Sequence, residues 1–390
     1  MQLTKKQQEG LDIAVNRFYS REKYTCIAGY AGAGKSTLVK FIVEALYLEP
    51  KDVCYIAYTG KAALVLKEKG CPNAMTAHRL LYKSFPRKDG TFYHMPKRIL
   101  DYPYKLIILD EVSMFPKEMW DLLLSHNIYV IALGDPGQLP PIGEDNGILA
   151  QPHIFLDEIM RQAQESEIIR LTMDIRAGKP LQLFKGNEVQ IIDKKDVVEG
   201  MFLWADQIIC AKNETRKNIN QLVRKYKFGV NTNDPIEGDK IICLRNDWEN
   251  PSEVGDVMVN GLLGTIHNIN YAPSNDWLKK DLIADFLPDG YENVDILNED
   301  VFFRQLHIDN KLLTTGEPTV TAKNFKYFPK KIKPKEFEYG YCITAWKAQG
   351  SEYDKVLVFE EDFPFDKDTH IRFLYTAATR SKKKLVIVRK

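Results

Sequence analysis

The chain has 390 residues, a net charge of +1 and a composition typical of globular proteins with two or three domains. No apolar run approaches the ~20 residues of a membrane span, and the N-terminal sequence MQLTKKQQEG is too polar for a signal peptide. The near-neutral charge gives no overall signal for binding a polyanion. We therefore expect a protein of the cytosol.

The first predicted elements are a helix, a strand and a second helix. Thr4 is placed as the N-cap of the first helix, in which apolar residues recur on one face. Residues 24–28 (YTCIA) form a short β-prone run, and residues 35–46 carry apolar side chains at helical spacing. This strand–helix unit provides the context that a phosphate-binding loop requires.

The loop between that strand and helix reads GYAGAGKST and fits the G-x-x-x-x-G-K-[ST] phosphate-loop pattern. Its glycines permit turns and close approaches that a Cβ would obstruct, so that backbone N–H groups face the phosphates. Lys35 is placed to reach the β- and γ-phosphates, and the Ser36 hydroxyl to bind Mg²⁺. A chance glycine-rich turn is the alternative. We predict ATP and Mg²⁺ as cofactors, with nucleotide-binding residues Gly29, Ala31, Gly32, Ala33, Gly34, Lys35, Ser36 and Thr37.

A second strand–helix unit follows, and an insertion then interrupts the pattern. Residues 53–58 predict a strand, Thr59 opens a helix, and Thr76 opens a shorter one. Residues 82–104 are rich in proline and aromatic residues and contain Asp89-Gly90, which suits a type I′ turn between strands at 83–88 and 91–95. We expect this insertion to be a β-hairpin.

An apolar strand at residues 105–109 ends in two adjacent acids, Asp110 and Glu111. Such a pair provides a carboxylate for the metal side and one that polarises the attacking water, so Asp110 is the predicted Mg²⁺ residue and Glu111 the predicted catalytic one. A solvent-exposed acidic turn is the alternative. Gln138 follows the next strand, 129–133. Because ligands bind beyond the carboxyl ends of parallel strands, we expect these residues to converge on the phosphate loop.

The second half of the chain predicts another α/β unit with an inserted β-region. Helical patterns and a strand run from residue 151 to 230, and Asn213 is the expected N-cap of the helix that ends near Tyr226. The α/β pattern resumes at 337–390. Between them, residues 231–336 contain short alternating strands at 240–244, 264–269 and 301–308 and an Asn260-Gly261 turn, which suggest a small β-barrel.

Two further features concern cysteine and lysine. The six cysteines lie far apart without a C-x-x-C pair, so we expect them to be reduced, mostly buried and not a metal site. Residues 318–335 hold six lysines and no acid, interleaved with aromatic residues. This pattern suits single-stranded nucleic acid, and a solvated lysine face is an equal alternative.

Taken together, these segments resemble the helicases of superfamily 1B, the RecD-like and phage Dda-like group. The resemblance covers nearly the whole chain in the right order. The matching segments are GYAGAGKST for motif I, YTGKAA for Ia, TAHRLL for Ib, LDEVSM for II, GDPGQLPPIG for III, ITAWKAQGSEYDKVLV for V and YTAATR for VI. Tyr58 and Trp346 depart from the usual Pro of motif Ia and His of motif V.

The resemblance implies roles for residues outside the phosphate loop. It makes Gln7 the adenine contact and Gln138 the γ-phosphate sensor, and it places Gly350 and Glu352 near the nucleotide. It also implies that Arg161 and Arg380 are catalytic arginines that reach the γ-phosphate from the second motor domain. The alternative is that both are surface arginines without a catalytic role. The residues that the resemblance implies hold the nucleic-acid backbone are Thr59, Lys61, Thr76, His78 and Thr344. Phe85 and Phe92 of the hairpin and Trp346 complete the expected nucleic-acid-binding residues.

The expected fold is α/β, with two RecA-like P-loop motor domains. We place the first at residues 1–150, with a pin hairpin at 82–104, and the second at 151–230 and 337–390, with the small β-barrel insertion at 231–336. Phe92, or else Phe85, is the expected wedge at a duplex fork. The alternative is that the hairpin aromatics pack into a miniature core.

The expected function is an ATP-dependent DNA helicase that translocates on single-stranded DNA and unwinds duplex DNA, and the resemblance implies 5′-3′ travel. We expect a monomer, with single-stranded DNA, duplex junctions and proteins of replication or recombination as partners. An RNA-directed helicase of the same superfamily is the nearer alternative. A P-loop ATPase that remodels protein or acts as a switch is the alternative from another class.

Overall fold

The computed structural model describes residues 3–71, 73–86, 92–158, 165–247, 258–271, 281–289, 302–317, 334–362 and 366–390. The chain folds into two compact units. Unit 1 contains Met1–Lys83, Met95–Val197 and Ala348–Lys390, and unit 2 contains Ser84–His94 and Val198–Lys347. No helix in the described ranges is long and apolar enough to cross a membrane. The predicted domain boundaries stay predictions.

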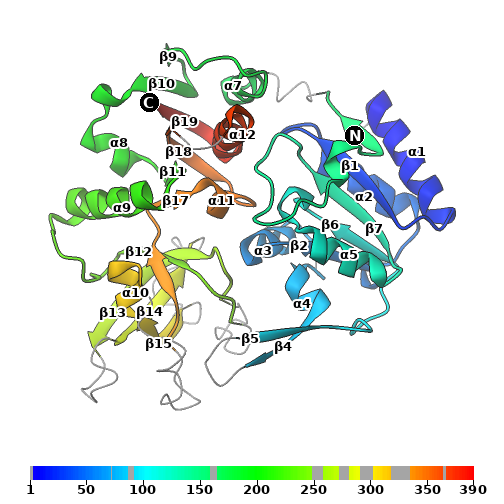
Figure 1. The fold of residues 1–390 in the computed structure, drawn as a ribbon, viewed down its shortest axis with the longest axis horizontal. Coiled ribbons are helices and arrows are strands. Elements are labelled where there is room, and N and C mark those ends of the chain that lie inside the picture. Colours follow the sequence, from blue (N-terminus) through cyan, green and yellow to red (C-terminus); the bar gives the residue numbers. More distant parts are fainter. Residues whose placement is uncertain are drawn as a thin grey trace. The chain divides into compact units, whose positions relative to one another are not determined.

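Unit 1 contains a six-stranded sheet in the order β3-β2-β6-β7-β1-β8 (Figure 1). All of its pairings are parallel. The central strands are buried along their whole length, as expected for a sheet covered on both faces. The strands are β1 (Tyr24–Gly29), β2 (Val53–Ala57), β3 (Met75–Thr76), β6 (Leu106–Leu109), β7 (Tyr129–Gly134) and β8 (Ile154–Leu156).

Helices cover both faces of this sheet because alternate strand residues point to opposite sides. Ile27, Ile108 and Ile131 pack in one cluster with residues of α1 (Lys5–Tyr19) and α2 (Lys35–Ala45). The neighbouring strand residues pack in a second cluster with α4 (Ala77–Leu81) and α5 (Lys117–Ser125). Helix α3 (Gly60–Glu68) adds a small cluster of alanines against Ala57. The predicted α/β fold of this part of the chain is confirmed.

The start of α1 is fixed by a capping box between Thr4 and Gln7. The Gln7 backbone N–H donates to Thr4 Oγ1, and the Thr4 N–H donates to Gln7 Oε1. Each side chain therefore satisfies a backbone donor that the first turn of a helix leaves without a partner. The sequence prediction that Thr4 caps this helix is confirmed.

The rest of unit 1 holds a second parallel set, in which β10 and β18 each pair with β19. Strand β9 adds antiparallel to β10. These elements are β9 (Phe184–Lys185), β10 (Val189–Asp193), β18 (Tyr353–Phe359), β19 (Ser381–Arg389), α7 (Glu167–Arg176) and α12 (Lys367–Ala378). Short 3-10 turns lie at η1 (Pro50–Asp52), η2 (Val112–Met114), η3 (Ile148–Ala150) and η4 (Lys194–Asp196).

Unit 2 begins with α8 (Glu199–Trp204), β11 (Gln207–Cys210) and α9 (Asn213–Phe228). Strand β11 pairs in parallel with β17 (Cys342–Thr344), which leads into α11 (Ala345–Ala348). The prediction that Asn213 caps α9 is wrong, because Lys212 is the extended N-cap residue and no side chain accepts a bond there. Asn213 already lies in the first turn of the helix.

The predicted barrel is a five-stranded antiparallel sheet in the order β15-β14-β13-β12-β16. An isolated bridge between Ile308 of β15 and Lys335, just before β16, joins its two edges. The two edge strands of the sheet therefore approach each other at this bridge. Its elements are β12 (Lys240–Cys243), β13 (Leu263–Tyr271), β14 (Asp281–Pro288), β15 (Phe303–Asp309), β16 (Phe337–Tyr339) and α10 (Asn310–Thr315).

Strand β14 was missed from the sequence because its acidic residues obscured the alternation. Leu282, Ala284 and Phe286 are buried, and Phe286 packs against the other barrel aromatics. Asp285 is also buried, and its carboxylate accepts bonds from the Asn268 side chain and the Gln305 backbone. A buried acid is tolerated here because its oxygens have donors.

The hairpin insertion is present as β4 (Tyr82–Pro86) and β5 (Phe92–Pro96), which form a two-stranded sheet. These strands match the predicted ones to within two residues. The expected turn at Asp89-Gly90 lies outside the described residues. The side chain of Phe85 is 47% exposed.

Five of the six cysteines are buried and all six are free thiols. Burial raises the pKa of the Cys26 thiol to about 12, so this thiol stays protonated at neutral pH. The described residues hold no group of three His, Cys, Asp or Glu side chains suited to a metal.

Candidate active site

The phosphate loop follows β1 at the carboxyl end of the parallel sheet and leads into α2. Gly32 and Gly34 have φ values of 78° and 80°, a region that favours glycine. A Cβ on Gly29 would lie 2.9 Å from the Leu156 carbonyl oxygen. The Lys35 ammonium donates to the Gly29 and Tyr30 carbonyl oxygens, at 2.6 and 3.2 Å. The loop thus has the strand-before, helix-after context that the sequence predicted.

Asp110 and Glu111 follow β6 at the same edge of the sheet. The Glu111 backbone is in the left-handed region, with φ of 54°, and its N–H donates to Asp110 Oδ1 at 3.0 Å. Backbone strain of this kind costs on the order of 1–3 kcal/mol and persists where the surroundings hold it. The two acids are therefore held in a defined arrangement rather than on a loose turn.

Burial raises the pKa of both Asp110 and Glu111. The nearby guanidinium of Arg380 and ammonium of Lys35 oppose this shift at Glu111 and favour its ionised form. Oxygen Oε2 of Glu111 is buried and accepts no hydrogen bond from a described residue. A buried carboxylate oxygen without a donor suits a water molecule that it polarises.

Arg380 is 5% exposed and lies just beyond the end of α12. Its guanidinium donates to the Thr376 and Ser351 carbonyl oxygens, at 3.1 and 3.3 Å. Its Nη1 lies 3.8 Å from Glu111 Oε1. The alternative of a surface arginine is wrong for Arg380, because this side chain is buried beside Glu111.

Gln138 follows β7 at the third neighbouring strand end, and its Oε1 is buried without a described donor. The N–H and carbonyl groups of the backbone around it are bonded to the C-terminal segment of unit 1. Leu139 N–H donates to Thr376 Oγ1 at 2.9 Å, and the Gln349 side chain donates to the Leu139 carbonyl at 3.1 Å. The side chain of Gln138 therefore projects from a fixed backbone.

The donor set fits Mg²⁺ held together with nucleotide phosphates. Mg²⁺ binds proteins through one or two carboxylates and substrate phosphates more often than through a full protein cage. Asp110 supplies one carboxylate and Ser36 one hydroxyl, and the charge of Lys35 acts on Asp110. These two residues would hold the ion.

Comparison with known proteins identifies the family and the fold of this chain. A family model described as an AAA domain matches residues 2–201, more than half of the chain. The chain belongs to this AAA domain family, as a superfamily 1B helicase of the RecD-like and Dda-like group. A second model, described as a UvrD-like helicase C-terminal domain, matches residues 339–388.

The chain is 22% identical to the ATP-dependent DNA helicase dda of Enterobacteria phage T4, over 97% of this chain and 98% of that protein. It also resembles the Pif1 helicase of Bacteroides in complex with ADP-AlF3 and single-stranded DNA, with a TM-score of 0.54, 17% identity and coverage of 99% and 92%. A structure described as two coordinating Pif1 helicases unwinding forked duplex DNA gives a TM-score of 0.56 at 18% identity, covering 100% and 92%. The fold of two RecA-like domains is confirmed.

The nucleotide-side predictions of the helicase resemblance fall into three groups. Gln7 is buried, with its Oε1 used by the capping box. An added Cβ on Gly350 would meet Ala62 at 2.9 Å, and the charge of Glu352 raises the pKa of Asp110, although burial raises it more. Arg161 lies outside the described residues. The adenine, nucleotide and arginine roles assigned to these residues stay predictions.

The strand-contact predictions in unit 1 lie on α3, α4 and the segment before each. Thr59 and Thr76 are N-caps whose hydroxyls accept backbone N–H groups. Thr76 is 1% exposed, so its side chain stabilises the start of α4. Lys61 lies over the Tyr353 ring at 4.9 Å, and His78 stacks on Tyr82. Their contacts with nucleic acid stay predictions.

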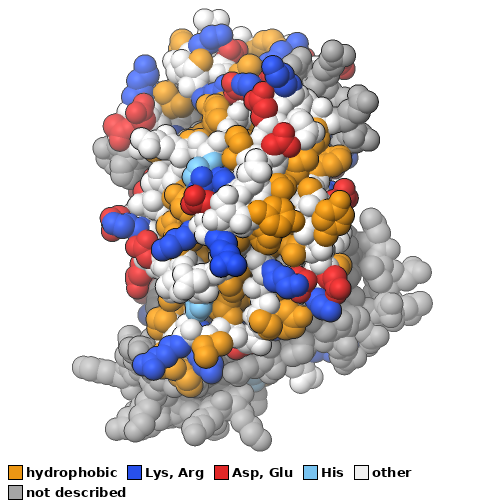
Figure 2. All heavy atoms as spheres, turned by 90° about the vertical axis from the view of Figure 1, so that its right-hand side faces the viewer, with side chains coloured by type: hydrophobic (Ala, Val, Ile, Leu, Met, Phe, Trp, Pro, Cys, Tyr) orange, Lys and Arg blue, Asp and Glu red, His pale blue; other side chains and the backbone are white. Residues whose placement is uncertain are grey.

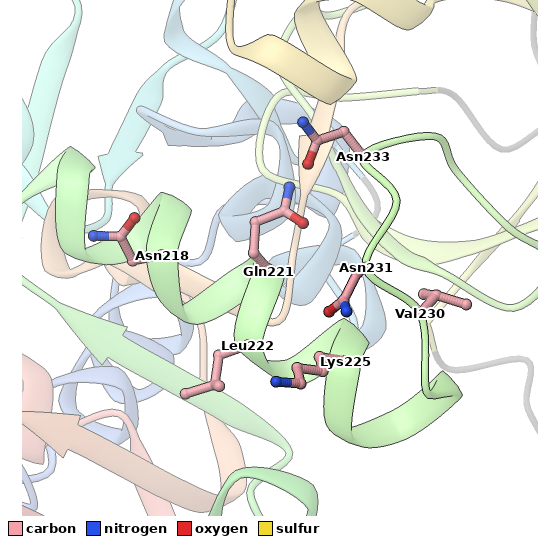
Figure 3. A pocket seen from close by; sticks show the side chains of 7 residues that line it. All are labelled: Asn218, Gln221, Leu222, Lys225, Val230, Asn231 and Asn233. Carbon is pink, nitrogen blue, oxygen red and sulfur yellow. The ribbon is translucent and has the colours of Figure 1, made fainter.

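In unit 2, Thr344 is buried at the end of β17 and Trp346 is half-buried in α11. The Phe92 side chain and residues 318–333 of the lysine-rich stretch lie outside the described residues. A surface pocket of about 340 Å³ in unit 2 contains none of the predicted site residues (Figure 3). Its lining consists of Asn218, Gln221, Leu222, Lys225, Val230, Asn231 and Asn233.

Sequence reasoning missed the residues that hold Gln138, namely Asp135, Gln349, Tyr375 and Thr376. A signal was present, because Asp135 lies in GDPGQ, Gln349 in KAQGS and the other two in YTAATR, all inside the matched motifs. Only the fold shows that these motifs contact one another.

Replacing Glu111 by Gln should preserve nucleotide binding and reduce ATP turnover about 10²-fold or more, because the amide keeps the shape and cannot accept a proton. Fluorescent nucleotide binding and steady-state hydrolysis measure the two effects. Since burial raises the pKa of Glu111, wild-type turnover should fall on the acid side at a higher pH than an exposed glutamate would give. Glu118→Gln, an exposed acid on α5, is the matched control. Equal loss of binding would assign Glu111 a structural role.

Replacing Arg380 by Ala should lower ATP turnover far more than ATP affinity if the guanidinium meets charge that develops in the transition state. Measuring kcat and nucleotide affinity separates the two. Arg389→Ala removes an arginine that pairs with Asp193 on the neighbouring strand and is the control. A variant weakened only in DNA binding would place Arg380 on the nucleic-acid track, and Arg380→Lys shows whether charge alone suffices.

Proposed function

We propose that this protein is an ATP-dependent 5′-3′ translocase on single-stranded DNA that unwinds duplex DNA. One observation carries this proposal. Glu111 is half-buried, with a buried Oε2, and feels the charges of Arg380, Lys35 and Asp135 at the sheet edge that also presents the phosphate loop. A phosphate loop with a strained acid, a glutamine and an arginine beside it is suited to hydrolysis rather than to binding alone.

The residues divide the work of hydrolysis among themselves. The loop N–H groups and the Lys35 ammonium bind and neutralise the phosphates. Glu111 accepts a proton from the attacking water, and Gln138 orients that water or the terminal phosphate. Arg380 stabilises the charge on the transferred phosphoryl oxygens. When bound, Mg²⁺ neutralises further charge on the β- and γ-phosphates.

Movement along a strand requires that ATP hydrolysis changes how tightly each domain binds that strand. We infer from the family that ATP draws the two motor domains together and that hydrolysis releases them. Each domain holds the strand backbone through its own residues, so alternating grip moves the protein in one direction. The 5′-3′ direction rests on the family resemblance.

DNA is favoured over RNA as the track because of the relatives. The phage relative is described as a DNA helicase, and two structural neighbours are described with single-stranded or forked DNA. The surface that Figure 2 presents carries basic, acidic and hydrophobic side chains intermixed, in keeping with the net charge of +1. Binding of nucleic acid should therefore depend on local contacts with the nucleic-acid backbone rather than on the overall charge of the protein. We propose that the protein acts as a monomer in the cytosol, on junctions that replication or recombination proteins also use.

ATP hydrolysis should rise strongly with single-stranded DNA and less with RNA. Steady-state rates with DNA, RNA and no polymer test this, with Lys35→Ala as background, because no other cation in the loop neutralises the β- and γ-phosphates. Unwinding of duplexes with a 5′ or a 3′ tail tests direction. A rate indifferent to polymers would favour the protein remodeller or switch, and stronger stimulation by RNA would favour the RNA-directed helicase.

Replacing Phe92 by Ala should slow duplex unwinding and leave DNA-stimulated hydrolysis largely intact. An aromatic ring at the fork stabilises a freed base by roughly 1 to 3 kcal/mol through stacking. Unwinding of a 5′-tailed duplex and hydrolysis on the single strand are measured on the same preparation. Tyr47→Ala, an aromatic that is 91% exposed elsewhere in unit 1, is the control.

If both activities fall together, or neither changes, Phe92 is not the wedge. Phe85→Ala is then the next variant, since its ring is exposed on β4. A loss of thermal stability in either variant would instead support the miniature aromatic core.

A further inference from the structure

Tyr375 lies on α12 and joins two parts of the active site through one hydroxyl group. The hydroxyl donates to Asp135 Oδ2 at 2.7 Å and accepts the Ala31 backbone N–H at 3.1 Å. Ala31 belongs to the phosphate loop, and Asp135 directly follows β7. The Tyr375 side chain is 1% exposed, so water does not compete for these two bonds.

The same tyrosine also fixes the backbone that leads to Gln138. The other oxygen of Asp135, Oδ1, accepts the Gly137 N–H at 2.9 Å. The Tyr375 ring packs so closely against Gly137 that a Cβ there would lie 3.0 Å from the ring. The next residue on α12, Thr376, accepts the Leu139 N–H. The residues on both sides of Gln138 are thus held by α12.

The protonation states suit this arrangement. Burial, the first cause, and the Asp135 carboxylate both raise the pKa of Tyr375 well above its usual range, so the hydroxyl keeps its proton. A neutral hydroxyl that donates to a carboxylate forms a charge-assisted bond, which is stronger than a neutral one. The Tyr375–Asp135 bond is therefore a strong link between α12 and the end of β7.

We propose that Tyr375 is a positioning residue for ATP hydrolysis, whose hydroxyl sets the separation between the phosphate loop and Gln138. This inference rests on the proposed function of the same site. Tyr375 acts through two backbone segments, the loop at Ala31 and the strand end at Asp135 to Leu139. Without the hydroxyl the loop still binds phosphates, and Gln138 no longer meets the terminal phosphate or the attacking water in register.

Tyr375→Phe removes the hydroxyl and keeps the ring that packs on Gly137. We expect kcat for ATP to fall about tenfold, the change that loss of one or two hydrogen bonds of ordinary strength produces. The KM for ATP and the affinity for a fluorescent ADP analogue should change less than about twofold. Basal and DNA-stimulated hydrolysis are both measured.

The matched control is Tyr129→Phe. This buried tyrosine lies on β7 in the same unit, and its hydroxyl also makes two hydrogen bonds, to Thr25 Oγ1 and the Ala14 carbonyl. The Tyr129→Phe substitution should lower the melting temperature about as much as Tyr375→Phe does and leave kcat unchanged. An equal fall of kcat in both variants would reduce Tyr375 to a purely structural residue and overturn the proposal.

A double variant shows whether Tyr375 acts through Gln138. If it does, Tyr375→Phe combined with Gln138→Ala turns over no more slowly than Gln138→Ala alone. Multiplied losses, an unchanged kcat in Tyr375→Phe, or a rise in KM alone would each overturn the proposal. If DNA does not stimulate hydrolysis, the proposed function is contradicted. The role of Tyr375 can still be tested in that case, because the basal hydrolysis rates of the single and double variants can be compared without DNA.

Discussion

Parallel pairing of β1, β6 and β7 is the constraint on which the active site depends. Ala28 pairs with Gly134, and Leu109 pairs with Ala132, so three strands end at one edge of the sheet. The residues that follow these strands are the phosphate loop, the Asp110-Glu111 pair and the segment leading to Gln138. In a parallel sheet the chain must return by a crossover connection each time, and every strand therefore presents the same end.

The functional groups at this edge of the sheet lower the stability of the folded protein. Burial raises the pKa of Asp110 and Glu111, and Glu111 also has a strained backbone. Neighbouring positive charges from Lys35 and Arg380 offset part of the desolvation cost. Glu111 Oε2 and Gln138 Oε1 remain buried without described donors. Unmet polar groups of this kind concentrate at functional sites, where a substrate supplies the missing bonds.

The C-terminal segment of unit 1 does more than bring Arg380 close to Glu111. Tyr375, Thr376 and Arg380 lie within six positions on or just after α12, and each bonds a different part of the site or its support. Helical spacing presents Tyr375 and Thr376 toward the strand ends, and the end of the helix lets Arg380 turn toward Glu111. One short element thus couples the loop, the acid and the glutamine backbone.

Much of this protein could be predicted from residue patterns, because local rules govern them. The phosphate loop, the Thr4 cap, the acids after an apolar strand and the hairpin all depend on residues close together in the chain. The acidic strand β14 and the true N-cap of α9 could not, since pairing and packing decided them. The sequence by itself determined the motifs and their order. Only the tertiary structure decided that Tyr375 meets Ala31 and Asp135, because bonds between residues 240 to 344 positions apart arise from how sheets and helices pack rather than from any local pattern.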